Sequence, residues 1–154
     1  LLELSGPMIS SSGKPAPGRL PVSIILPVFN KVEFTKKCLA RLAAIPCAVP
    51  YELIVVDDHS TDGTEAFCLA QVQVQSNLRY HRLPENRGFG RACNHGAAQA
   101  RGHWLVFLNN DTEPEPGWLE AAMSRFESDP TIGIVGAKLL YPDRTVQHCG
   151  LAFF

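Results

Sequence analysis

The sequence lacks the features that mark several classes of protein. No apolar run approaches the ~20 residues that a membrane-spanning helix needs, and no signal peptide is visible. The 14 basic and 15 acidic side chains nearly cancel, so the composition lacks the positive excess that nucleic acid or an acidic membrane attracts. The five cysteines form no C-x-x-C pair, which argues against a zinc site and a disulfide framework. We therefore expect reduced thiols in a cytoplasmic protein that binds no nucleic acid.

The length and composition fit one globular domain. The chain has 154 residues, of which 45% are apolar. Residues 5–21 are rich in Ser, Gly and Pro, which is linker composition. The chain begins at Leu1 rather than methionine and ends at Phe154 inside an apolar run. We expect a linker over residues 1–20, then one domain over residues 21–154 that is truncated at its C-terminal end.

Strand and helix patterns alternate along the chain. Asn30 with Glu33, and Asp62 with Glu65, have the spacing of helix capping boxes. Pro27 is expected to end the first strand. The expected strands are 22–26, 51–56, 78–83, 104–109 and 132–140. The expected helices are 31–45, 62–75, one that follows a glycine-bearing turn and ends near Gly102, and 116–128.

This alternation predicts an α/β fold with a mostly parallel central sheet and helices on both faces. Polar clusters follow three of its strands: Pro27-Val28-Phe29-Asn30, Asp57-Asp58 and Asn109-Asn110-Asp111. Ligands of open parallel sheets bind outside the carboxyl ends of the strands. The three clusters therefore predict one binding site, with the first and fourth strands as neighbours.

The segment "VVDDHSTDGT" has two interpretations. Asp, Ser and Thr favour a helix entry, which accounts for Ser60 to Glu65. Asp57 and Asp58 remain unexplained, because adjacent carboxylates that leave a buried strand repel each other. Either carboxylate could accept a hydrogen bond from the imide N–H of a pyrimidine base.

The segment "NNDTEP" follows a strand, Trp104 to Leu108, that the pattern predicts to be buried on both faces. Asn and Asp suit a turn. The acids Asp111, Glu113 and Glu115 also suit a divalent cation such as Mg²⁺ or Mn²⁺ that is shared with substrate phosphates. Both readings stay open on the residues alone.

The segment "GFGRAC" nearly matches the G-x-G-x-x-G pattern of dinucleotide-binding folds. Cys93 replaces the third glycine, and the turn follows the third strand instead of the first. Gly88 and Gly90 therefore favour a tight turn into a helix. Arg87 and Arg91 are either phosphate contacts or solvated side chains.

Four segments together resemble a known family. "SIILPVFN", "ELIVVDDHSTDGT", "ENRGFGRACNHGAAQARGHWLVFLNNDTEPEPGWL" and "IGIVGAKLLYPDRTVQHCG" resemble, in order and spacing, the family 2 glycosyltransferases with the GT-A fold. The resemblance spans about residues 21–150. It implies an inverting transferase whose donor is a nucleotide-diphosphate sugar and whose acceptor is a saccharide or a lipid-linked molecule. It also implies a cytoplasmic enzyme, peripheral to the inner face of the cell membrane in its full-length form.

The resemblance assigns roles to individual residues. Pro27 and Phe29 would flank the base and ribose, with Glu33 close by. Asp57 would take the uracil or thymine imide, with Asp58 beside it. Asn109, Asn110 and Asp111 occupy the position of the family's D-x-D motif, in which Asp111 would bind Mn²⁺ or Mg²⁺.

The sequence departs from the family pattern at two points. Asn109 stands where the D-x-D motif has its first acid. Similar N-N-D-T versions occur in relatives that resemble rhamnosyl- and galactofuranosyl-transferases of bacterial surface polysaccharides, which favours a UDP- or dTDP-sugar donor. The family's catalytic base is expected beyond Phe154, so no residue of this chain is assigned as the base.

Two other functions remain open from the sequence. A catalytically inactive nucleotide-sugar-binding module would be consistent with the single carboxylate of the motif. A nucleotidyltransferase would need a loop rich in glycine and basic residues after the first strand, and "PVFNKVEF" has no glycine.

Overall fold

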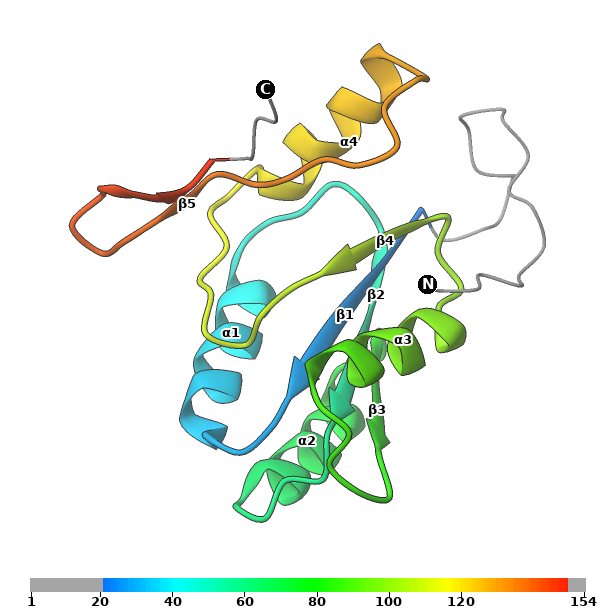
Figure 1. Ribbon diagram of the computed structural model, residues 1–154, viewed down its shortest axis with the longest axis vertical. Helices are drawn as coiled ribbons and strands as arrows, with labels where there is room; N and C mark the ends of the chain where they lie inside the picture. The colour runs from blue at the N-terminus through cyan, green and yellow to red at the C-terminus, as the bar shows by residue number, and fades with distance from the viewer. Residues whose placement is uncertain (1–20, 150–154) are drawn as a thin grey trace. The chain divides into compact units, whose positions relative to one another are not determined.

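The computed structural model describes residues 21–149, so the expected linker over residues 1–20 lies outside the described part. The described residues form two compact units, 21–120 and 121–149. The first unit contains β1 (Val22–Val28), α1 (Val32–Ala44), β2 (Tyr51–Asp57), α2 (Thr64–Val74), β3 (Leu78–Arg82), α3 (Phe89–Gln99) and β4 (Trp104–Phe107), as Figure 1 shows. Helix α4 (Trp118–Ser128) begins in the first unit, and β5 (Leu139–Leu140) and β6 (Val146–His148) belong to the second.

The first unit contains one four-stranded sheet in the order β3-β2-β1-β4. All three strand pairs are parallel, and β1 pairs with both β2 and β4. The predicted α/β class, the parallel sheet and the neighbouring first and fourth strands are therefore confirmed. The central strand β1 is buried along its whole length.

Helices cover both faces of the sheet. On one face, α3 approaches so closely that a Cβ atom added at Gly96 would lie 2.5 Å from Ile25 and 3.1 Å from Val56. The residues that alternate with these, such as Ile24 and Val55, are also fully buried and face the other side. Helix α2 packs against β2 and β3 on that second side, behind the strands in Figure 1, and it contacts α1.

The prediction that Pro27 ends the first strand is wrong. Strand β1 continues to Val28, and Pro27 is in register with Val56 of β2. The Ile25 carbonyl accepts a bond from Leu108, so odd-numbered residues of β1 direct their backbone groups toward β4. Pairing with β4 ends at Ile25, so no strand lies opposite the Pro27 nitrogen. Proline is tolerated at this position because its missing N–H would have no strand partner.

Strand β4 is shorter and less buried than expected. It ends at Phe107 instead of Asn109, and the side chains of Leu105 and Phe107 are 43% and 51% exposed. The reason is its position at the edge of the sheet, where β1 is its only strand partner among the described residues. The apolar run correctly indicated a strand but wrongly indicated burial on both faces.

The two helix starts also differ from the predicted capping boxes. Asn30 does not cap α1: the N-cap is Lys31, and both residues have a positive φ. Asp62 caps α2 from two residues before it, accepting the Thr64 N–H at 2.9 Å, and its second oxygen accepts the Val32 N–H at 3.0 Å. One carboxylate therefore serves both helix starts, which a search for local spacing cannot find.

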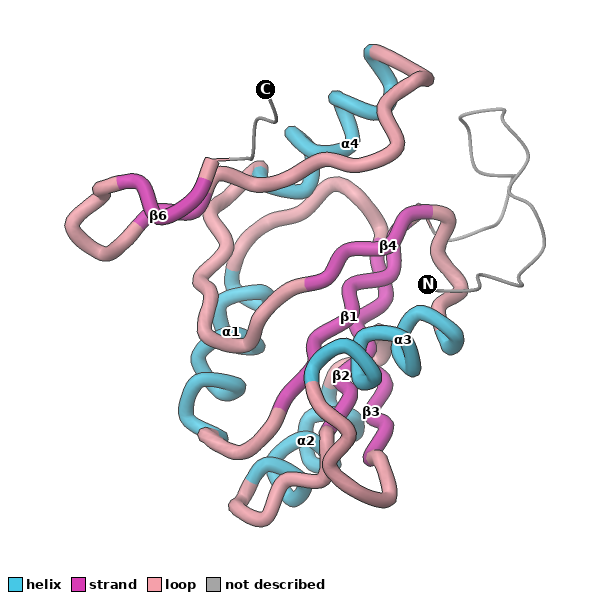
Figure 2. The backbone as a smooth tube through the Cα atoms, in the orientation of Figure 1, coloured by secondary structure: helices cyan, strands magenta, loops and turns pink. Residues whose placement is uncertain are grey.

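In the second unit, the predicted strand over residues 132–140 is wrong for most of its length. Only Leu139–Leu140 is a strand, and it pairs antiparallel with β6. Most of residues 129–145 are loop in Figure 2, and Ile134 is 90% exposed. Gly133 and Gly136 interrupt the apolar run. Glycine weakens a strand because it loses more backbone entropy on folding than other residues and has no side chain to pack.

At the amino ends of the strands, a buried carboxylate joins four segments. Glu52 of β2 accepts bonds from the Ser23 hydroxyl and the Arg101 backbone N–H, both at 2.6 Å, and from Arg79 at 3.0 Å. The Ser23 hydroxyl accepts the Gly102 N–H at 2.8 Å. Because helix α3 ends at Gln99 rather than near Gly102, the chain can make this close approach to β1.

Candidate functional site

A crevice opens at the carboxyl ends of the strands in the first unit. Its volume is about 590 Å³, within the ~300–1,000 Å³ of small-molecule sites. All three polar clusters expected from the sequence contribute to it. The lining residues are Pro27, Val28, Phe29, Lys31, Phe34, Asp58, Asn86, Gly88, Phe89, Ala92, Asn109, Asn110 and Asp111.

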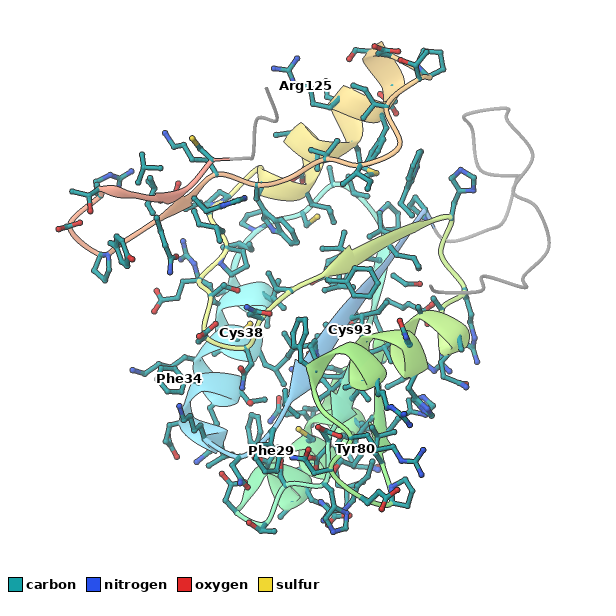
Figure 3. The ribbon with its side chains drawn as sticks, viewed as in Figure 1. Phe29, Phe34, Cys38, Tyr80, Cys93 and Arg125 are labelled. Atoms are coloured by element: carbon teal, nitrogen blue, oxygen red, sulfur yellow. The ribbon has the colours of Figure 1, made fainter. Side chains whose placement is uncertain are left out.

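The segment after β1 supplies an aromatic wall. Figure 3 shows Phe29 just past the end of β1 and Phe34 on the adjoining helix α1. Phe29 is 49% exposed, so its ring is available to a ligand. The turn that carries it is fixed by Asn30, whose N–H donates to the Ser60 hydroxyl at 2.8 Å and whose side-chain oxygen accepts the Thr61 N–H at 2.8 Å.

Asp58 lines the crevice and also shapes its opposite wall. Its two carboxylate oxygens accept the backbone N–H groups of Arg87 and Gly88, each at 2.7 Å. These bonds hold the turn before α3, in which Gly88 has a φ of 81°. The glycine is required there because this φ is strained for any other residue. The turn places Phe89, which is 59% exposed, at the crevice.

Asp57 is fully buried and does not line the crevice. One of its oxygens accepts the Ser60 N–H at 2.7 Å. The other accepts the Tyr80 hydroxyl at 2.6 Å and the Arg82 guanidinium at 3.0 Å. Contact between Asp57 and a base stays a prediction, and it requires one of these bonds to be exchanged.

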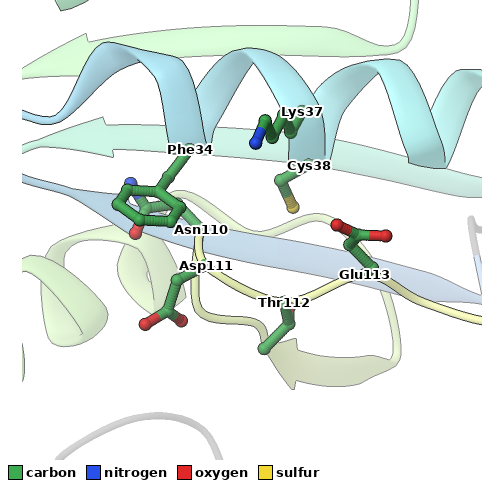
Figure 4. A pocket seen from close by; sticks show the side chains of 7 residues that line it. All are labelled: Phe34, Lys37, Cys38, Asn110, Asp111, Thr112 and Glu113. Carbon is green, nitrogen blue, oxygen red and sulfur yellow. The ribbon is translucent and has the colours of Figure 1, made fainter. Parts of the chain in front are cut away.

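The loop after β4 brings Asn109, Asn110 and Asp111 to the crevice. Asp111 is exposed, whereas the side-chain amide of Asn110 turns inward and donates to the Thr35 hydroxyl at 3.0 Å. Figure 4 shows that the carboxylates of Asp111 and Glu113 point in different directions. The three acids expected to gather in this segment therefore do not form one cluster.

The residues present fit a divalent cation that is bound together with a ligand. Within residues 21–149, no group of three or more His, Cys, Asp or Glu side chains could hold a metal. The exposed Asp111 carboxylate is one hard oxygen ligand, and Asn109 adds an amide oxygen at the same crevice. Mg²⁺ and Mn²⁺ are commonly held by one or two carboxylates, with phosphates and water completing the shell. Such a cation would depend on the phosphates of a ligand.

Several residues considered in the sequence lie elsewhere. Glu33 is outside the crevice lining and forms an exposed ion pair with Lys36 at 2.7 Å. Arg87 pairs with Glu85 at 2.6 Å rather than lining the crevice.

Sequence reasoning missed Lys31, Phe34, Asn86 and Phe89 as lining residues. Phe34 shares the helical spacing of Cys38 and Leu42, so the sequence pattern alone does not distinguish a side chain that lines a crevice from one that packs in the core. Asn86 and Phe89 belong to the "ENRGFG" segment, which was weighed mainly as a dinucleotide motif.

Comparison with known proteins identifies the class to which this sheet and crevice belong. Residues 23–147 match the family described as "Glycosyl transferase family 2". The chain is therefore a member of glycosyl transferase family 2, and its fold is the GT-A fold.

Similar curated proteins support this membership. The O-antigen biosynthesis protein RfbC of Myxococcus xanthus is 34% identical over 138 residues, which cover 89% of this chain and 11% of RfbC. Glycosyltransferase AglE of Haloferax volcanii is 34% identical over 125 residues, covering 79% of this chain and 41% of AglE. The chain thus spans between about a tenth and two fifths of the length of these two relatives.

Solved structures share the fold. The mannosyltransferase PcManGT from Pyrobaculum calidifontis, in complex with GDP-Man and Mn²⁺, has a TM-score of 0.67 and 27% identity, covering 76% of this chain and 35% of that protein. The S. aureus protein TarS (residues 1–349), in complex with UDP-GlcNAc, has a TM-score of 0.63 and 27% identity, covering 70% of this chain and 31% of that protein.

No helix among residues 21–149 is long and apolar enough to cross a membrane.

Proposed function

We propose that this chain binds the nucleotide-diphosphate sugar donor of a hexosyltransferase-type glycosyltransferase, and that the donor is a UDP- or dTDP-sugar. The observation that carries the proposal is the convergence of Phe29, Asp58 and Asp111, from three separate strand ends, on one crevice of about 590 Å³. Family membership and the two nucleotide-sugar complexes among similar structures support the same ligand class.

The proposed roles follow the chemistry of the lining. Phe29 and Pro27 pack against the base and ribose, because an exposed ring offers a stacking surface beside the strand end. Asp58 lies at the crevice, and Asp57 lies directly before it at the strand end. Together they favour a base that donates an imide N–H. Asn109 and Asn110 contribute amide groups next to the sugar and diphosphate.

A divalent cation held by Asp111 would neutralise charge on the leaving diphosphate, which is the usual contribution of a metal to group transfer. Phe29, Asp58 and the Asn109–Asp111 loop would hold the donor so that one face of the anomeric carbon stays open to the acceptor. If that face is opposite the diphosphate, an acceptor hydroxyl that attacks there forms the new glycosidic bond while the bond to the diphosphate breaks, and the configuration is inverted. The carboxylate that takes its proton is proposed to lie outside residues 1–154.

We further propose a saccharide or lipid-linked acceptor in bacterial cell-surface polysaccharide synthesis. The similarity to the O-antigen biosynthesis protein RfbC of Myxococcus xanthus supports this setting. A cytoplasmic protein at the inner face of the cell membrane would meet both a soluble donor and a lipid-linked acceptor.

A catalytically inactive nucleotide-sugar-binding module is the second candidate. It is favoured by one observation: Asn109 leaves Asp111 as the only carboxylate of the motif at the crevice. A transfer assay with the full-length protein separates the two candidates, because both bind donor and only the enzyme forms a glycosidic bond.

Calorimetric titration of UDP and dTDP, with and without Mn²⁺, tests the proposal. We expect Mn²⁺ to tighten binding in the wild type, and Asp111→Asn to remove this effect while the fold is retained. Glu113→Gln is the matched control, because it removes an equal charge from the same loop outside the crevice. Equal Mn²⁺ dependence in the wild type and Asp111→Asn would refute the role of Asp111. Binding of NAD in place of UDP and dTDP would favour the dinucleotide alternative.

A further inference from the structure

One face of helix α1 carries a row of side chains that bond to the loop after β4. Thr35, Cys38 and Arg41 are spaced three residues apart, so they lie along the same side of the helix. Each is placed to bond to a residue between Asn109 and Pro114, more than 70 positions away in the sequence. Figure 4 shows Cys38 of this row on the helix and residues 110–113 of the loop, which line a small pocket of about 70 Å³.

The first contact of the row is buried. Thr35 is fully buried, and its hydroxyl accepts the side-chain N–H of Asn110 at 3.0 Å. A polar side chain so deeply buried is costly unless it is hydrogen-bonded. The bond therefore fixes the Asn110 side chain inward. Because Asp111 is the next residue, it also sets the direction in which the chain presents Asp111 to the crevice.

The last contact of the row holds the other side of the loop. The Arg41 Nε–H donates to the backbone carbonyl of Pro114 at 2.9 Å. Between these two bonds, the Cys38 thiol makes a longer contact of 4.0 Å with the Asn109 carbonyl. Burial, followed by the nearby Asp111 and Glu113, raises the pKa of Cys38 to about 12, so the thiol remains a protonated donor.

We propose that Thr35 and Arg41 are positioning residues for Asp111. They hold the loop before and after this carboxylate, so that its oxygens are oriented before any ligand enters. The part of this inference that concerns the metal rests on the function proposed above. The part that concerns loop order does not, because the contacts exist without a ligand.

The test compares two substitutions of the same residue. Thr35→Val keeps the shape of the side chain and removes the hydroxyl, whereas Thr35→Ser keeps the hydroxyl. Amide hydrogen exchange of residues 109–114 in the ligand-free protein reports the order of the loop. Calorimetry with UDP reports the Mn²⁺-dependent gain in affinity. We expect Thr35→Val to speed exchange in the loop and to reduce the Mn²⁺-dependent gain about tenfold, the effect of one lost hydrogen bond.

Thr35→Ser should restore both readouts toward the wild type, and affinity for UDP without Mn²⁺ should be similar in all three proteins. Arg41→Lys, which keeps the charge but lacks the Nε–H, should speed exchange near Pro114. Unchanged loop exchange in both Thr35→Val and Arg41→Lys would overturn the inference. A third outcome combines faster loop exchange in the two variants with no Mn²⁺-dependent binding of UDP by the wild type. It would support the inference on the loop and reject the proposed function.

Discussion

The hydroxyl of Tyr80 donates to the buried carboxylate of Asp57 at 2.6 Å, joining β3 to the strand end that carries Asp57 and Asp58. Burial, followed by the negative charge and hydrogen bond of Asp57, raises the pKa of Tyr80 well above its usual value. The phenol therefore keeps its proton throughout the physiological range. Arg82 completes the arrangement by donating to the same oxygen at 3.0 Å and to the Ser60 carbonyl at 2.8 Å.

Removal of the Tyr80 hydroxyl should weaken this strand end. We expect Tyr80→Phe to lower the free energy of unfolding by about 1.5–3 kcal/mol, the range for hydrogen bonds to charged groups. Urea denaturation measures the change. Tyr141→Phe is the control, because this residue is half exposed. A Tyr80→Phe protein as stable as the wild type would show that Arg82 and Ser60 suffice to hold Asp57.

Two glycines of helix α3 should respond oppositely to alanine. Gly96→Ala places a Cβ atom 2.5 Å from the buried Ile25 side chain, and overpacking of this kind costs about 1–3 kcal/mol. At Gly90 no atom lies within 4 Å of the added Cβ, so alanine should stabilise the helix by roughly 0.5 kcal/mol. Thermal melts of the two variants check the difference in sign. Equal shifts would mean that α3 packs less closely on β1 than described.

The cysteines should differ sharply in their reaction with iodoacetamide at pH 8. Burial, together with nearby carboxylates, raises the pKa of Cys38 and of Cys68 to about 12. Both thiols therefore stay protonated and enclosed, whereas Cys149 is exposed. Peptide mass spectrometry should find Cys149 labelled first, and Cys38 and Cys68 labelled only after denaturation. Rapid labelling of Cys38 in the native protein would contradict its placement beneath the Asn109–Pro114 loop.

The contribution of Glu52 to stability should depend on pH. Burial alone would raise the pKa of this carboxyl, but bonds from Ser23, the Arg101 N–H and Arg79 together lower it. A lowered folded-state pKa gives stability that is full above the unfolded value, near 4.5, and is lost as pH falls through the folded value. Glu52→Gln should therefore cost about 2 kcal/mol or more at pH 7, because it weakens charged hydrogen bonds.

Denaturant unfolding of the wild type and Glu52→Gln at pH 7 and at pH 3 measures this dependence. The difference between the two proteins should shrink at the lower pH. If the difference in unfolding free energy between the two proteins is the same at pH 7 and pH 3, the effect of the substitution comes from packing and not from charge.

Local patterns were sufficient to predict the sheet. Runs such as "VSIIL" and "YELIVV" are apolar over the length of a strand and are bounded by helical spacing, so the alternation and the parallel pairing follow from the sequence. The same logic placed Phe29 and Asp111 at one edge, and the crevice confirms it.

Features that depend on distant partners could not be predicted in this way. Asp62 caps α1 from a position 30 residues away, and Thr35 looks like an ordinary helix residue until Asn110 is placed beside it. The prediction that β4 is buried on both faces is wrong for the same reason. The composition of a strand does not reveal whether it has one neighbouring strand or two. For the long fifth strand, Gly133 and Gly136 are a local signal against the prediction, because they interrupt the apolar run.

The position of Pro27 in β1 has a consequence during synthesis of the chain. The Gly102 N–H and the Ser23 hydroxyl that it bonds lie 79 positions apart, so a ribosome needs roughly ten seconds to supply the segment that completes this side of β1. During that interval β1 is an uncharged, apolar strand with an unpaired edge, the kind of segment that associates with other nascent chains. Pro27 has no N–H to offer such a neighbour, and it stands on the edge that β4 leaves uncovered. Pro27 therefore closes one hydrogen-bond position on this edge to an incoming strand, both in the finished sheet and while β4 is still absent.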